Sequence, residues 1–260
     1  MLNILYGIGL ENWRLILGEG TAEYNMAVDE AILTLNNLRQ RANVLRLYVF
    51  KPSAITIGYF QKVYETVNIE YANRSSIPIV RRITGGGAVY HDEYGEITYS
   101  VVAKVGDIDF DVQESYRKIC NGILYALNFL GLDGRFEPVN DVTINGRKVS
   151  GSAQIRKGNT LLQHGTLMYD TDISKIEKLF PVPKDKLIAH GVKTIYDRVT
   201  TLSREKGSKI SKQEVINALV RGFEKAFNIK LYEDSLNDEE NNLVMELVKK
   251  YGRRDWNFRW

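Results

Sequence analysis

Short apolar runs rich in β-branched residues recur between Asn12 and Tyr169, and this pattern is typical of strands. Turn signals separate them. Lys51-Pro52-Ser53 divides two of the runs, and Asn145-Gly146 between two others favours a two-residue hairpin. The predicted strands cover residues 12–18, 44–50, 54–58, 77–80, 95–102, both arms of the hairpin, 160–169 and 230–232.

Longer segments carry apolar residues at helical spacing. Thr21 and Asp111 can each cap a helix, and Ser211 with Glu214 forms a capping-box pattern. The predicted helices start at Thr21, cover 111–132, 173–180, 215–227 and 238–251, and include part of 184–199. Asn25 and Asp29 lie four apart on the first helix, where we expect a solvated polar stripe rather than a catalytic pair.

Composition narrows the class of protein. Hydrophobic residues make up 44% and charged residues 26% of the 260 residues, as in a globular protein. A net charge of +3 is compatible with an anionic ligand and too weak to indicate a nucleic-acid partner. No apolar run approaches the ~20 residues that span a bilayer, so we expect a cytoplasmic protein. The length allows one large domain or one domain with a small appendage. One cysteine, Cys120, rules out an intrachain disulfide.

The most informative stretch is Arg81-Arg82-Ile-Thr-Gly-Gly-Gly-Ala-Val-Tyr-His91-Asp92. Three glycines between strands allow a ligand to reach backbone N–H groups, which can form an anion nest. Two arginines suited to carboxylate or phosphate enter this turn. The alternative is a plain glycine-rich hairpin with solvated arginines. The paired arginines and Tyr90-His91-Asp92 favour a site for a small anionic, phosphorylated molecule. The spacing matches neither a P-loop nor a dinucleotide-binding turn.

A second informative stretch surrounds the Asn145-Gly146 turn. Lys148 follows the turn and precedes small residues at 150–153. It is either a solvated strand residue or a fixed charge that binds a phosphate or polarises a carbonyl. His164 is interpreted as a satisfied sheet histidine in preference to a site edge. Cys120, in the middle of a helix without an adjacent histidine or lysine, is interpreted as an inert hydrophobe.

Together these blocks resemble the lipoate–protein ligase A family, within the biotin and lipoate ligase superfamily. The resemblance covers nearly the whole chain, in family order. The matching stretches are Asn25–Ala31, Gly58–Gln61, Arg81–His91, Asn140–Val142, Gly146–Ala153, Gln163–Leu167 and Trp256-Asn257. The resemblance implies that residues 1–260 form a single catalytic domain without a C-terminal accessory domain. The implied fold is α/β of the α+β type: a mixed, largely antiparallel sheet flanked by helices, like the class II synthetase and biotin ligase catalytic domains.

The resemblance also implies a reaction. ATP activates lipoate to lipoyl-AMP, and the lipoyl group then moves to a lysine of an acceptor domain. Lys148 is the implied catalytic residue and contacts the carboxylate and α-phosphate. The other implied ATP- and adenylate-binding residues are Arg82, Gly86, Gly87, Ala88, Val89, Tyr90, His91, Asn140, Asp141 and Ala153, with Asp141 as a candidate Mg²⁺ ligand. Tyr59, Phe60 and the small residues at 150–153 are candidates for the tunnel of the lipoyl tail. From the residues alone, Gly58 at the end of a predicted strand permits close backbone approach, and Phe60 favours a core position over a site position.

The implied partners are lipoyl domains of 2-oxoacid dehydrogenase E2 subunits and the glycine-cleavage H protein. Single-chain members of the family continue after the Trp-Asn segment, so we expect a separate small accessory protein to replace that domain. Two other functions stay open: an octanoyl or lipoyl transferase, and a non-catalytic module that binds lipoate or an acyl-adenylate. Related octanoyltransferases carry a nucleophilic cysteine near the Asn140 block, where this chain has Asn140-Asp141, so the ligase is the expected function.

Overall fold

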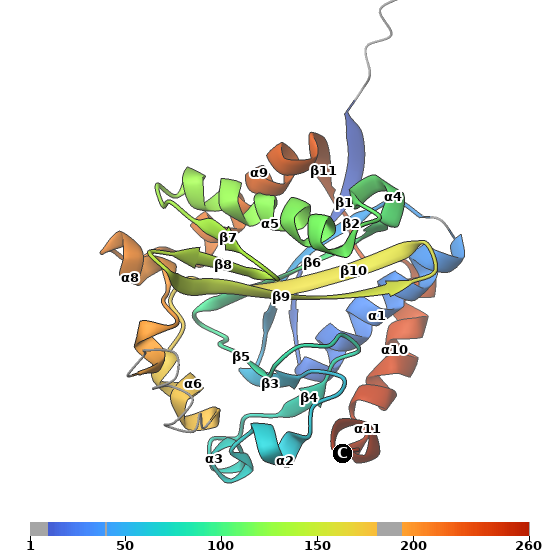
Figure 1. Ribbon diagram of the computed structural model, residues 1–260. Coiled ribbons are helices and arrows are strands. Elements are labelled where there is room, and N and C mark those ends of the chain that lie inside the picture. Colours follow the sequence, from blue (N-terminus) through green and yellow to red (C-terminus); the bar gives the residue numbers. More distant parts are fainter. Residues whose placement is uncertain (1–9, 40, 181–193, 260) are drawn as a thin grey trace, which may run out of the picture.

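The computed structural model describes residues 10–39, 41–180 and 194–259 of the chain. A large mixed sheet forms its centre, with strand order β11-β1-β2-β6-β10-β9-β8-β7 (Figure 1). β1 pairs parallel with β2 and β11, and the other pairs in this sheet are antiparallel. Its strands are β1 (Glu11–Gly20), β2 (Val44–Phe50), β6 (Glu96–Lys104), β7 (Arg135–Glu137), β8 (Asp141–Ile144), β9 (Arg147–Lys157), β10 (Thr160–Met168) and β11 (Ile229–Glu233).

Helices cover both faces of this sheet, which confirms the expected fold class (Figure 1). The helices α5 (Val112–Phe129) and α9 (Lys212–Phe227) share one core with one face. The helices α1 (Ala22–Arg39) and α10 (Asp238–Tyr251) share a second core with the other. The central strand β2 is therefore buried along its whole length, as a strand covered on both faces must be.

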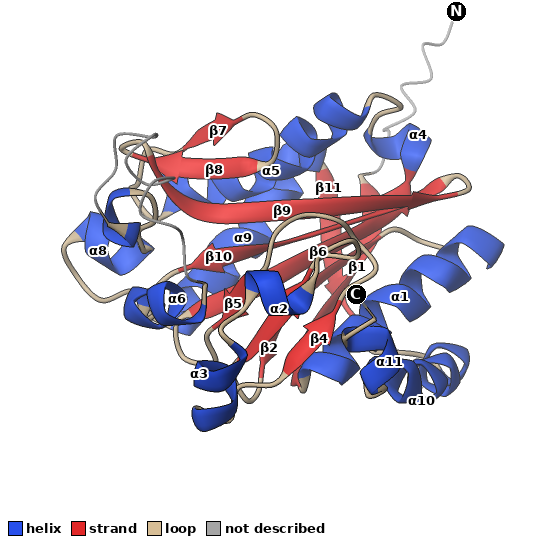
Figure 2. Cartoon of the chain, turned by 60° about the horizontal axis from the view of Figure 1, so that its bottom comes forward, coloured by secondary structure: helices blue, strands red, loops and turns tan. Residues whose placement is uncertain are grey.

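A second, three-stranded sheet lies below the large one, in the order β4-β3-β5 (Figures 1 and 2). It is made of β3 (Ala54–Ile57), β4 (Ile79–Arg81) and β5 (Val89–His91). Short helices surround it: α2 (Val63–Thr66), α3 (Ile69–Arg74), α6 (Ile173–Leu179) and α11 (Arg254–Asn257). The remaining helices are α4 (Val105–Ile108), η1 (Ile195–Asp197) and α8 (Leu202–Lys206).

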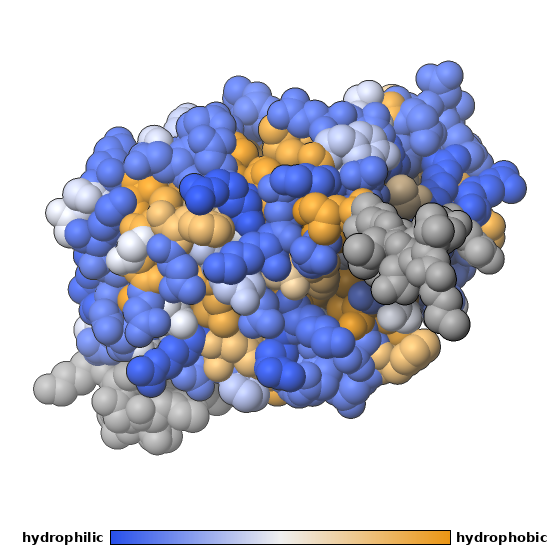
Figure 3. Space-filling model, turned by 90° about the horizontal axis from the view of Figure 1, so that it is seen from above, coloured by the Kyte–Doolittle hydropathy of each residue, from blue (hydrophilic) through white to orange (hydrophobic). Residues whose placement is uncertain are grey.

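Local sequence signals start the helices where expected. Asp111 accepts a hydrogen bond from the Glu114 amide at the start of α5, and Ser211 with Glu214 forms the predicted capping box of α9. The helix predicted within 184–199 falls mostly outside the described residues, and only η1 is seen there. Viewed from above, over α5 and α9, the surface is largely hydrophilic with separate hydrophobic groups (Figure 3).

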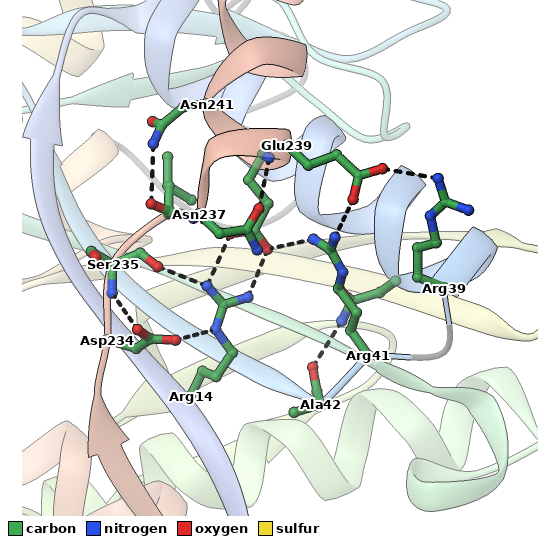
Figure 4. A network of polar contacts seen from close by, with 12 residues as sticks. Arg14, Arg39, Arg41, Ala42, Asp234, Ser235, Asn237, Glu239 and Asn241 are labelled. Atoms are coloured by element: carbon green, nitrogen blue, oxygen red, sulfur yellow. Dashed lines mark hydrogen bonds and ion pairs between the residues drawn. The ribbon is translucent and has the colours of Figure 1, made fainter.

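An ion-pair network attaches the start of α10 to the sheet (Figure 4). Arg14 of β1 donates to both carboxylate oxygens of buried Glu240, at 2.6 and 2.9 Å, and to Asp234 at 2.6 Å. Arg39 and Arg41, at the end of α1, donate to Glu239. The network holds α10 beside α1, on the face that lies over the small sheet. Within the described residues, no helix combines the length and apolar character needed to cross a bilayer.

Candidate active site

The glycine turn, residues 82–88, connects β4 with β5 and packs tightly against its surroundings. A Cβ added at Gly58 would lie 2.0 Å from the carbonyl oxygen of Gly86, so the backbones approach too closely there for any side chain. Gly86 has φ +91°, which L side chains rarely adopt, and its position for a Cβ lies 3.8 Å from the Ala153 Cβ of β9. The expected close backbone approach at Gly58 is confirmed, and the turn lies over β9.

The Arg82 side chain holds this turn by hydrogen bonds. Its Nε donates to Thr84 Oγ1 at 3.0 Å, and one terminal nitrogen donates to the carbonyl and hydroxyl oxygens of Thr56, both at 3.3 Å. The other donates to the carbonyl oxygens of Gly85 and Gly87, at 2.6 and 2.8 Å. These bonds use all five N–H groups of a guanidinium. Contact of Arg82 with an anionic ligand stays a prediction, and it requires exchange of one of these bonds.

Burial lowers the pKa of Arg82 to about 10, so the guanidinium is charged at neutral pH. Arg81 is also buried, and it points the other way. It donates to the backbone carbonyls of Gly58 and Tyr59 and to that of Asn257 in α11, each at 3.0 Å. The alternative of solvated arginines is therefore wrong, and Arg81 joins the small sheet to α11.

Lys148 enters the site from the β8–β9 hairpin. Asn145 and Gly146 have φ of 52° and 73°, as a two-residue turn with positive φ at both positions requires. Lys148 Nζ lies 2.6 Å from Asp141 Oδ1 on the paired strand. A Cβ at Gly151 would come within 2.4 Å of Nζ, so the missing side chain at residue 151 leaves the space that the ammonium group occupies.

A cavity of about 610 Å³ joins the glycine turn with the hairpin. Lys148 therefore faces the same space as the turn, although about sixty residues separate the two in sequence. All the residues predicted to bind ATP or the adenylate line this cavity: Arg82, Gly86, Gly87, Ala88, Val89, Tyr90, His91, Asn140, Asp141, Lys148 and Ala153.

Other lining residues carried no clear signal in the sequence. Met26, Met168, Ile176 and Phe180 give the cavity an apolar part, and they come from α1, β10 and the region of α6. Helical or strand periodicity marks such residues only as buried. Arg198, Thr56 and Thr98 add polar groups. So does His164, for which the site edge was the less favoured interpretation.

The expected tunnel residues Tyr59 and Phe60 are not part of this lining. Phe60 is 78% exposed, and the preference for a core position is wrong. Gln61 accepts a hydrogen bond from the Gly58 amide at 2.9 Å and closes a turn that carries Phe60 outward.

The expected solvated stripe of α1 is wrong as well. Asn25 and Asp29 are fully buried beneath the cavity. Arg46 of β2 donates to Asn25 Oδ1 at 2.6 Å and to Asp29 Oδ1 at 3.0 Å. A buried arginine needs a partner, and these two side chains, one helical turn apart, supply it. The periodicity of a helix cannot show that a charged side chain from a distant strand will pack against it.

Asp29 is the centre of a wider network. Its Oδ1 also accepts from Ser100, at 2.9 Å, and its Oδ2 accepts from Tyr48 at 2.8 Å and lies 3.0 Å from His164 Nδ1. Burial by itself raises the pKa of Asp29, but the His164 hydrogen bond and the charge of Arg46 outweigh burial and lower the pKa overall. His164 is thus a satisfied sheet histidine, as expected, and it also borders the cavity.

Cys120 is buried in α5 and is absent from the cavity lining. Burial raises the pKa of its thiol to about 12, although hydrogen bonds with Ser152, Tyr99 and Gln163 act in the opposite direction. Such a thiol is almost entirely protonated at neutral pH and is a poor nucleophile. This agrees with its interpretation as an inert hydrophobe.

The candidate magnesium ligand is already engaged, because Asp141 pairs with Lys148. The part of the chain that the structure describes contains no group of three or more His, Cys, Asp or Glu that could hold a metal ion. A single carboxylate beside an ammonium group is a poor site for a divalent cation, which seeks several oxygen ligands. The donor set here does not fit Mg²⁺.

Comparisons with known proteins identify the class. Residues 21–224 match the family described as the lipoyl protein ligase A/B catalytic domain, and the chain belongs to this family. Octanoyltransferase LipM of Clostridioides difficile is 34% identical over 272 residues, which cover 95% of this chain and 99% of that protein. LipM of Bacillus subtilis is 32% identical over 276 residues, covering 96% and 99%.

Among solved structures, a bi-partite lipoate protein ligase from Thermoplasma acidophilum, studied with its E2 lipoyl domain, superposes with a TM-score of 0.86. It is 33% identical, and the match covers 95% of this chain and 96% of that one. The chain is thus an enzyme of the family that contains lipoate ligases and octanoyltransferases.

These relatives correct the expected activity. The prediction of an ATP-dependent lipoate ligase is wrong, because curated relatives that match nearly the whole chain are octanoyltransferases. The physical reason is that a glycine turn and a lysine are suited to an activated carboxyl group in either reaction, so these residues do not distinguish a ligase from a transferase. The expectation of an accessory protein was built on the ligase interpretation and loses that basis.

Proposed function

We propose that this chain transfers an octanoyl or lipoyl group from an activated donor to a lysine of an acceptor lipoyl domain. The observation that carries this proposal is the cavity in which Lys148 and the glycine turn share one space. The similarity to octanoyltransferases over nearly the full chain supports the transferase chemistry.

The geometry suits nucleophilic acyl transfer. The acceptor amine adds to the donor carbonyl, and the carbonyl oxygen becomes an oxyanion. The Lys148 ammonium group and the amides of the glycine turn are the donors available to stabilise it. When the oxyanion collapses, the bond to the leaving group breaks, an amide forms, and the proton lost by the amine balances the one gained by the leaving group.

Transfer is direct in this proposal, without an acyl-enzyme. The chain contains one cysteine, and Cys120 is buried, outside the lining and with a raised pKa. Asp141 holds the Lys148 ammonium group in place at 2.6 Å. The apolar part of the cavity, with Met26, Met168 and Ile176, suits an unbranched acyl chain.

The proposed acceptors are lipoyl domains of E2 subunits and the glycine-cleavage H protein. The Thermoplasma acidophilum neighbour is described together with its E2 lipoyl domain, and this supports the first of them. The donor arrives already activated, as a thioester or a comparable acyl ester, so the reaction requires neither ATP nor Mg²⁺. A cytoplasmic location stays a prediction.

Mass spectrometry of an apo lipoyl domain tests the proposal. The chain is incubated with the acceptor in two arms, one with an octanoyl thioester and one with free octanoate, ATP and magnesium. We expect acylation of the acceptor lysine in the thioester arm. Product confined to the ATP arm would overturn the transferase proposal.

Lys148→Ala then tests the role of the cation. We expect a loss in kcat/KM on the order of 100- to 1,000-fold, the usual effect of removing one oxyanion donor. Lys157→Ala is the matched control, because Lys157 is an exposed lysine of the same strand outside the cavity. Equal rates for the two variants would remove Lys148 from the mechanism.

A further inference from the structure

Two chains of hydrogen bonds, with the same order of side-chain types, converge on Arg82. In the first, Asp29 Oδ2 lies 3.0 Å from His164 Nδ1, and His164 Nε2 lies 2.7 Å from Thr84 Oγ1. Thr84 Oγ1 in turn accepts from Arg82 Nε at 3.0 Å. The order is carboxylate, histidine, threonine, arginine, and all four side chains are buried.

The second chain repeats this order with different residues. Glu96 Oε2 lies 2.8 Å from His91 Nδ1, and His91 Nε2 lies 2.9 Å from Thr56 Oγ1. Thr56 Oγ1 accepts from a terminal nitrogen of Arg82 at 3.3 Å. The other oxygen of Glu96 accepts from Thr98 at 2.6 Å. These side chains are also buried.

The direction of both chains follows from chemistry. A guanidinium only donates and a carboxylate only accepts. Each threonine hydroxyl, which accepts from Arg82, has a single proton to give, and the neighbouring acceptor is a histidine Nε2. Because each Nδ1 faces a carboxylate, each histidine must carry a proton on Nδ1, and the threonine hydroxyl can donate to an unprotonated Nε2.

We propose that His91 and His164 are held as neutral, Nδ1-protonated tautomers, and that through Thr56 and Thr84 they act as positioning residues for Arg82 and the glycine turn. Burial lowers the pKa of His164, which agrees with a neutral ring. The protonation of Nε2 would place two donors against each other unless the threonine hydroxyl rotated away.

The consequence for the site passes through the turn. Arg82 holds the carbonyls of Gly85 and Gly87. Among the described residues, the structure records no protein acceptor for the amides of Gly86 and Gly87. The two chains therefore fix the backbone whose free amides face the reacting carbonyl, and this last step rests on the proposed function.

Nitrogen-15 NMR of the histidine rings tests the tautomers without any activity. At pH 7 we expect His91 and His164 each to show a protonated Nδ1 and an unprotonated Nε2. Spectra of His190→Gln remove the signals of the third histidine, which lies outside the described residues. Nε2-protonated or doubly protonated rings at pH 7 would overturn the proposal.

Threonine variants test the positioning. Thr84→Val removes the hydroxyl and keeps the shape, and we expect kcat/KM for transfer to fall about 10- to 100-fold, the scale of a small misplacement of reacting groups. The nitrogen-15 shift of His164 Nε2 should then move, because this atom loses its hydrogen-bond partner, while Nδ1 keeps its proton toward Asp29. Thr84→Ser should restore both the rate and the shift. Thr160→Val, a buried threonine outside the cavity and both chains, is the control.

The outcomes separate the two proposals. If the wild-type chain transfers no acyl group but the ring nitrogens are as expected, the proposed function fails and the tautomers stand. If Thr84→Val transfers at the wild-type rate, the positioning role is overturned, whatever the tautomers.

Discussion

Replacement of Asp29 by asparagine should destabilise the fold by about 3–5 kcal/mol, the usual cost of removing one partner of a buried ion pair. Asp29 and Arg46 are 1% and 2% exposed, and their atoms lie 3.0 Å apart. The substitution keeps the volume of the side chain and removes its charge. Arg46 then has no buried carboxylate, and the new amide group must face groups that donate to Asp29.

Two milder substitutions grade the contribution of the Asp29 network to stability. Ser100→Ala removes one of the four donors to Asp29 and leaves the Arg46 pair intact. A hydrogen bond to a charged group contributes about 1.5–3 kcal/mol, so this variant should fall between wild type and Asp29→Asn. Glu19→Gln breaks an ion pair whose side chains are 50% and 55% exposed, and it should change stability little.

Urea unfolding followed by circular dichroism measures these changes. A folded domain has about 5–15 kcal/mol of stability, so a loss of this size shifts the unfolding midpoint clearly. If Asp29→Asn costs less than Ser100→Ala, or no more than Glu19→Gln, the network beneath the cavity does not contribute as the structure indicates.

Three further predictions concern single features. Gly86→Ala should impair transfer strongly, because the φ angle of residue 86 is +91° and the new Cβ would lie 2.9 Å from an Arg82 nitrogen. Wild-type kinetics in this variant would show that the turn can relax. Cys120→Ser should keep most of the transferase activity, and loss of transfer in this variant would indicate an acyl-enzyme. Iodoacetamide at pH 8 should not alkylate the folded wild-type chain, because the thiol pKa is about 12. The unfolding free energy should fall as the pH drops below about 6.5, the usual histidine pKa, because the folded-state pKa of His164 is lowered. It should fall again below about 4, the usual aspartate pKa, because the folded-state pKa of Asp29 is lowered. A stability that rises on acidification over this range would contradict both shifts.

The sequence was sufficient wherever a structure depends on neighbouring residues. Local backbone preferences and periodicity account for the caps at Asp111 and Ser211, the Asn145-Gly146 hairpin and the fully buried strands β2 and β3. The glycine turn and Lys148 were singled out from local sequence, because glycines that tolerate close approach and a lysine beside small residues are visible there, and the other predicted site residues came from the family resemblance. Their shared cavity was an inference that the structure bears out.

The sequence could not report contacts made between distant segments. The interpretation of Asn25 and Asp29 as solvated was wrong because Arg46 reaches them from β2. The preference for Phe60 in the core was wrong because a turn closed by Gln61 carries it outward. The five acceptors around Arg82 come from residues 56 to 87, and only the folded chain shows that its donors are already used. Local backbone preference determines which helix or strand forms. Whether a charged side chain can be buried depends on the partner that the tertiary structure places beside it.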